Sequence, residues 1–101
     1  MAETKKERYR RIRGTLLKLL AHQHPGPLEF KELHFLLDDM GYTITGDELR
    51  SHVSYLEDGN FVSVDKRKTG GIEFEMIRIS NKGLNILDGF GVGDNGVDAK
   101  F

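Results

Sequence analysis

Residues 44–62, ITGDELRSHVSYLEDGNFV, decide the fold expected for this chain, because they run from a helix start through a helix into a strand. Thr45 and Glu48 stand three positions apart, the spacing of a capping box that satisfies backbone donors at a helix N-terminus. An apolar stripe at helical spacing follows, formed by Leu49, Val53 and Leu56. We therefore predict a helix over residues 46–58, ended by Gly59 and followed at once by a strand.

The residues after this helix predict a β-hairpin. Residues 61–64 and 72–79 are rich in β-branched and aromatic residues, and residues 65–71 between them end in Gly70 and Gly71. The hairpin tip is expected to be basic, with Lys66, Arg67 and Lys68 in the loop. The hairpin should cover the open side of the helices and bury Ile72, Phe74, Ile77 and Ile79. Ser80 can cap a fourth, short helix that ends at Asp88.

Two further helices are predicted upstream. Thr4 and Glu7 repeat the capping-box spacing, and apolar residues recur at helical intervals up to residue 20, which predicts a helix over residues 4–22. Residues 25–27, Pro-Gly-Pro, end it, because proline cannot continue the backbone hydrogen bonding. Residues 28–30 are a short strand or an extended lead-in, and residues 31–40 have the apolar spacing of a second helix.

Three helices, a hairpin and a short helix follow the order of a winged helix-turn-helix domain. Residues 56–62, LEDGNFV, are similar to the "L-E-x-x-G-(hydrophobic)-V" passage of many bacterial regulators, with Gly59 one position early. Residues 77–84, IRISNKGL, resemble the passage after the second wing strand in MarR-like, PadR-like and ArsR-like proteins. The resemblance covers residues 4–88. It implies an α+β fold: a three-helix core with a β-hairpin wing and a short C-terminal helix.

The chain divides into an expected winged-helix domain, residues 1–88, and a C-terminal segment, residues 89–101. The segment has four glycines, Gly89, Gly91, Gly93 and Gly96, and no apolar periodicity. It is therefore predicted to be flexible. A core of this size gives a domain of marginal stability, which makes a homodimer plausible.

The resemblance implies double-stranded DNA as the partner and transcription regulation as the function. The outward side of the third helix, with Arg50, Ser51, Ser54 and Tyr55, is expected in the major groove. Lys66, Arg67 and Lys68 of the wing are expected on the backbone or in the minor groove. The basic start of the chain, which includes Arg10 and Arg11, is expected to hold flanking phosphates or an acidic partner, such as a second copy.

The charge distribution keeps a second function open. The net charge is −1, but residues 1–26 carry net +5 and residues 27–60 net −6. Bulk attraction to nucleic acid is excluded, so any DNA binding must use local patches. The third helix is itself net acidic, because it contains Asp47, Glu48, Glu57 and Asp58. The alternative is therefore a winged-helix protein–protein interaction module without DNA binding. RNA or single-strand binding is a weaker third option, because no aromatic stacking platform supports it.

Other classes of protein are disfavoured by the residues that are missing. The chain has no cysteine, and its four histidines are not arranged as ligands, so no metal site is expected. Adjacent carboxylates, such as Asp38 and Asp39, point in different directions on a helix, and neither a phosphate-binding loop nor a nucleophile elbow is present. We expect neither a cofactor nor enzymatic activity.

No apolar run reaches the roughly 18–20 residues of a membrane helix, and a cytoplasmic location is expected.

Overall fold

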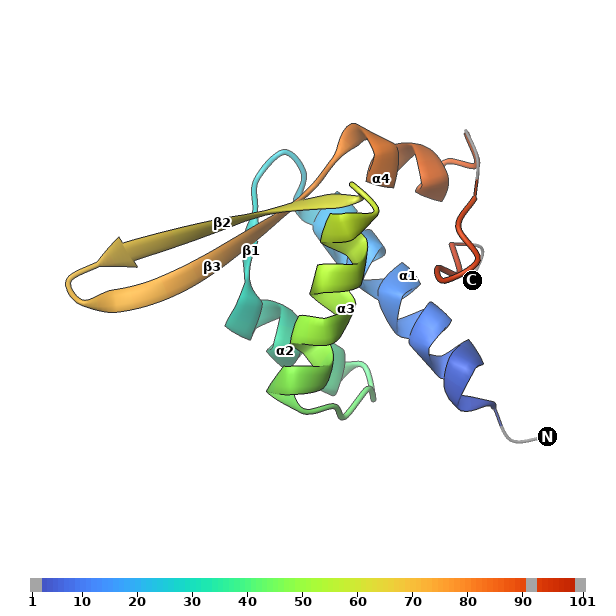
Figure 1. Cartoon of the computed structure of the whole chain (residues 1–101), viewed down its shortest axis with the longest axis horizontal. Coiled ribbons are helices and arrows are strands. Elements are labelled where there is room, and N and C mark those ends of the chain that lie inside the picture. The colour runs from blue at the N-terminus through green and yellow to red at the C-terminus, as the bar shows by residue number, and fades with distance from the viewer. Residues whose placement is uncertain (1–2, 91–92, 100–101) are drawn as a thin grey trace.

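A computed structural model describes residues 3–90 and 93–99. Three helices pack together, a long hairpin projects from them, and a short helix lies beside the hairpin base (Figure 1). This is the predicted α+β arrangement of a three-helix core, a wing and a short C-terminal helix. The elements in chain order are α1 (Lys5–Gln23), β1 (Leu28–Glu29), α2 (Phe30–Asp39), α3 (Gly46–Asp58), β2 (Val62–Thr69), β3 (Ile72–Ile79) and α4 (Asn81–Leu87).

Local capping explains where three of the helices begin. The side-chain oxygens of Thr4, Thr45 and Ser80 each accept a hydrogen bond from the backbone N–H three residues later, at 3.1 Å. These caps satisfy donors that have no partner inside the helix. The predicted bounds of α3 are confirmed, and those of α1 and α2 differ from the prediction by one residue at each end.

The hairpin, which we call the wing, is longer and more regular than predicted. The antiparallel sheet has the order β1-β3-β2, with Leu28 opposite Ile77 and Thr69 opposite Ile72. The prediction that residues 65–71 form a loop is wrong. The two strands pair up to a two-residue turn of Gly70 and Gly71, whose φ angles are 59° and 81°. A hairpin turn of this kind needs two positive φ angles, which glycine adopts without strain.

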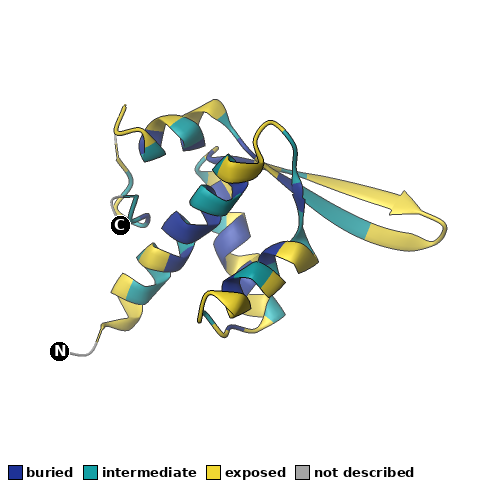
Figure 2. Ribbon diagram, turned by 180° about the vertical axis from the view of Figure 1, so that it is seen from behind, coloured by how far each residue is buried: buried dark blue, intermediate teal, exposed yellow. Residues whose placement is uncertain are grey.

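The core lies where the three helices meet the base of the wing (Figure 2). Phe61, between α3 and β2, is the largest of the fully buried side chains. Ile77 and Ile79 are buried as predicted, whereas Phe74 is half-buried and Ile72 is 58% exposed. The prediction for Ile72 is wrong because the outer half of the wing extends past the helices, so no other element covers it (Figure 2). Other core residues are Ile12, Leu16, Leu17, Leu20, Leu33, Leu37, Leu49 and Leu56.

Part of the glycine-rich C-terminal segment lies against α1 and α3. Val97 is 4% exposed, and the Asp98 N–H donates to the carbonyl of Arg10 at 3.0 Å. Residues 93–99 thus have defined contacts, whereas residues 91, 92, 100 and 101 lie outside the described part of the chain. These contacts do not test flexibility, which stays a prediction for residues 89–101.

Candidate nucleic-acid interface

A shallow groove of about 170 Å³ lies between α3 and the inner part of the wing. It contains three of the residues that the sequence predicts to contact DNA: Arg50 and Ser54 from α3, and Lys66 from β2. The fold therefore brings the outward side of α3 and the wing onto one concave surface. The remaining lining residues are Phe30, Val53, Glu57, Val64 and Glu75.

Arg50 is held in place within this groove. Its Nη1 donates to both carboxylate oxygens of Glu75, each at 2.8 Å, and its guanidinium carbon lies 4.6 Å from the centre of the Phe30 ring. The Arg50 side chain is 55% exposed, so this ion pair contributes little to stability. Its main effect is to orient the guanidinium between α3 and the wing. The sequence alone did not point to Glu75 or Phe30 as neighbours of Arg50, because neither lies near it in the chain.

Each of the three cations predicted at the wing tip has an acidic residue nearby. The Lys66 ammonium lies 4.0 Å from Glu75, and Arg67 Nε donates to Asp65 at 2.8 Å. Lys68 stands opposite Glu73 in the pairing of β2 with β3. Because side chains alternate along a strand, Lys66 and Lys68 share one face of β2 and Arg67 projects from the other. The wing therefore carries positive groups on both faces, partly balanced by its own acidic residues.

Ser51 and Ser54 are exposed on α3, but Tyr55 lies apart from them. Its hydroxyl donates to Asp94 at 2.7 Å, and the guanidinium carbon of Arg13 lies 3.8 Å from the ring centre. The hydrogen bond to Asp94, followed by burial, raises the pKa of Tyr55. The structure thus places Tyr55 toward α1 and the C-terminal segment rather than in the groove beside the wing.

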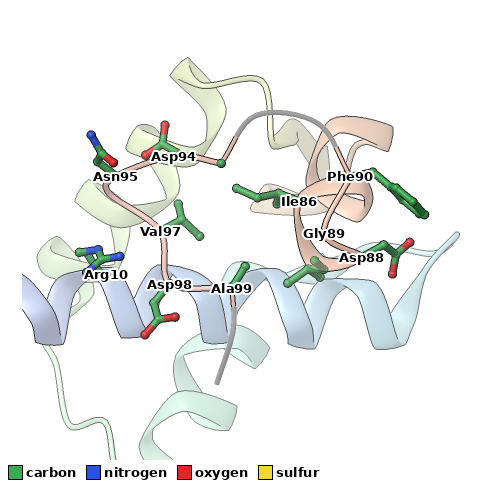
Figure 3. A pocket seen from close by; sticks show the side chains of 12 residues that line it. Arg10, Ile86, Asp88, Gly89, Phe90, Asp94, Asn95, Val97, Asp98 and Ala99 are labelled. Carbon is green, nitrogen blue, oxygen red and sulfur yellow. The ribbon is translucent and has the colours of Figure 1, made fainter.

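Arg10 and Arg11 are also distant from the wing. They belong to the N-terminal half of α1, which lies at the end of the molecule opposite the hairpin turn (Figure 1). Arg11 is exposed and pairs with Glu3 at 3.1 Å, whereas Arg10 is half-buried beside the C-terminal segment (Figure 3). A single copy of the chain therefore does not present Arg10, Arg11 and the wing on one face.

A buried histidine connects α3 to α1. His52 is 3% exposed, and its Nδ1 accepts a hydrogen bond from Arg13 Nε at 3.1 Å. Burial, and secondly the positive charge of Arg13, lower the pKa of His52 from 6.5 to about 4. His52 is therefore neutral near pH 7, with its proton on Nε2.

The lowered pKa of His52 is expected to make the folded chain less stable in mild acid. The unfolded chain binds a proton at His52 below pH 6.5, but the folded chain binds it only near pH 4, so protonation favours unfolding in that interval. The contribution of His52 to stability should be present above pH 6.5 and lost as the pH falls toward 4. The free energy of unfolding, measured with urea at several pH values across this range, should fall more steeply with decreasing pH than it does in His52→Asn. The difference in slope should correspond to the uptake of up to about one proton on unfolding. Equal pH slopes in the two proteins would contradict the prediction.

Within residues 3–90 and 93–99, no three histidine or carboxylate side chains converge in a way that would hold a metal ion. None of the helices described is both long enough and apolar enough to cross a membrane.

Comparison with known proteins identifies a similar solved structure. Neither a protein-family model nor a curated protein matches the sequence. A PadR family transcriptional regulator from Eggerthella lenta DSM 2243 matches in structure with a TM-score of 0.62 and 26% sequence identity. The match covers 77% of this chain and 70% of that regulator. The chain therefore has a winged helix-turn-helix fold similar to that of a PadR family transcriptional regulator.

Proposed function

We propose that this chain is a DNA-binding transcriptional regulator that places α3 in the major groove and the wing along the adjacent backbone. The observation that carries this proposal is the groove shared by Arg50, Ser54 and Lys66, because it joins the predicted base-reading helix to the predicted phosphate-binding hairpin. The structural similarity to a transcriptional regulator supports the same function. The predicted homodimer belongs to this proposal, since two copies would read two half-sites.

Each group has a distinct role in the proposed complex. Arg50 donates to a guanine edge or a phosphate with the nitrogens that Glu75 does not engage, while Ser51 and Ser54 donate to bases or phosphates. Lys66, Arg67 and Lys68 neutralise phosphates and release counterions. Because cations stand on both faces of the wing, both faces of the hairpin can contact phosphates as it runs along the DNA backbone.

The carboxylates of the same surface favour one alternative, a protein–protein interaction module. Glu57 and Glu75 line the groove, and each would be repelled by nearby phosphates. Together with the acidic residues at the start of α3, they make this face suitable for a basic protein partner. The alternative requires that duplex binding be absent even at low ionic strength.

The salt dependence of duplex binding tests the proposal. Fluorescence anisotropy at several salt concentrations should show that log affinity falls linearly and steeply with log salt. The slope should correspond to the neutralisation of about four to six phosphates. Lys66→Ala and Arg67→Ala should each reduce that slope by about one and weaken binding by about threefold to fivefold.

Lys5→Ala is the matched control, because Lys5 is an exposed cation at the start of α1, and this end of α1 lies opposite the hairpin turn (Figure 1). It should leave the slope unchanged. Absence of duplex binding at low salt would refute the regulator and favour the interaction module. Equal slope changes in all three variants would show that the wing is not the contact surface.

A further inference from the structure

We infer that this chain has a binding site for a small oxyanion, of the type of a free phosphate group, on the side of α3 away from the wing. The site is a groove of about 370 Å³ between α1, α3 and the C-terminal segment. Its volume lies within the range of small-ligand sites. Its lining comprises Lys6, Tyr9, Arg10 and Arg13 from α1, Tyr55 from α3, and residues 95–96.

Arg10 supplies the first observation for an anion. Its Nε is buried, and no hydrogen-bond acceptor for it exists among the residues that the structure describes. Buried polar atoms in folded proteins almost always have a partner, and an unpaired donor on a charged group is especially unfavourable. An oxyanion in the adjacent groove would balance the charge of the guanidinium that carries this unpaired donor.

Arg13 supplies a second cation that is already fixed in position. Its Nε donates to His52 and its Nη1 donates to the Gly96 carbonyl at 3.2 Å, while its guanidinium stacks on the Tyr55 ring. Both acceptors are uncharged, since His52 is neutral, so these bonds orient the guanidinium without neutralising it. An anion would therefore meet a positive charge whose side chain has little conformational freedom left to lose.

The charge of the lining selects an anion. Among the described residues, the groove is lined by Lys6, Arg10 and Arg13 and by no carboxylate. The neighbouring cavity of about 800 Å³ differs, because Asp88, Asp94 and Asp98 line it together with Arg10 (Figure 3). Asp94 lines that cavity rather than the groove, and its Oδ1 already accepts from the Tyr55 hydroxyl and the Gly96 N–H. An oxyanion is therefore directed to the smaller groove.

Titration with inorganic phosphate, followed by NMR without DNA and at constant pH and ionic strength, tests the inference. Saturable shifts are expected at the Nε–H resonances of Arg10 and Arg13. Arg10→Met should weaken phosphate binding by about fivefold or more. Arg11→Met is the matched control, because Arg11 is the next residue, is exposed, and does not line the groove; its affinity for phosphate should equal that of the unmodified chain.

Lys6→Met provides a second test at an exposed position, where loss of folding is not a concern. It should weaken phosphate binding by about twofold to threefold. Linear, non-saturating shifts in the unmodified chain, or equal affinities in Arg10→Met and Arg11→Met, would overturn the inference. Shifts that require a DNA duplex and never occur with free phosphate would also overturn it, because nucleic acid would then supply the anion. The test does not depend on whether the wing binds DNA.

Discussion

Gly83→Ala is expected to lower the free energy of unfolding by about 2–3 kcal/mol. Gly83 lies in α4, which packs against the junction of α3 and β2, and a Cβ there would come within 2.5 Å of the Phe61 carbonyl oxygen and 2.6 Å of Ile79 Cγ1. The carbonyl cannot move without cost, because it accepts the Ser80 N–H at 2.9 Å. The methyl group would therefore push α4 away from the base of the wing.

Gly46→Ala is the matched control, since Gly46 is also a helical glycine but has no atom within 4 Å of its Cβ position. Alanine there should stabilise the protein by about 0.4–1 kcal/mol, because it restricts the unfolded chain. Urea unfolding followed by circular dichroism measures both changes. If Gly83→Ala were as stable as the unmodified chain, the close packing of α4 against Phe61 would be refuted.

Glu75→Gln is expected to strengthen duplex binding by about tenfold. Glu75 accepts both hydrogen bonds from Arg50 Nη1 and lies 4.0 Å from the Lys66 ammonium, so its charge offsets two cations of the proposed interface. Glutamine has nearly the same shape but no charge. The substitution removes a group that repels phosphates and makes Arg50 and Lys66 fully available to them, so the salt slope should also increase.

Glu73→Gln is the control for this prediction. It removes the same charge from β3, opposite Lys68, but Glu73 is exposed and is not part of the groove that contains Arg50. Anisotropy titrations should show a change of about twofold or less for Glu73→Gln. Equal gains in both variants would mean that only the total charge matters. Weaker binding by Glu75→Gln would show instead that Glu75 orients Arg50 for DNA.

The groove between α3 and the wing was partly predictable. The order of the elements and the resemblance of residues 44–62 and 77–84 to bacterial regulators together place Arg50, Ser54 and Lys66 on neighbouring elements. The sequence did not reveal that Tyr55 lies toward α1 or that Arg10 is half-buried beside the C-terminal segment. Both outcomes depend on residues 93–99, whose glycine-rich sequence has no pattern that predicts packing.

The amino-acid sequence alone determined the helix starts at Thr4, Thr45 and Ser80, because a helix cap depends on neighbours within a few positions. The tertiary structure decided the partners of the charged and aromatic side chains. Arg50 and Glu75 are 25 positions apart, and the pairs Arg13–His52 and Tyr55–Asp94 are each 39 positions apart. Periodicity and capping describe local backbone geometry, whereas such contacts arise only when packing of the core sets the distances between elements.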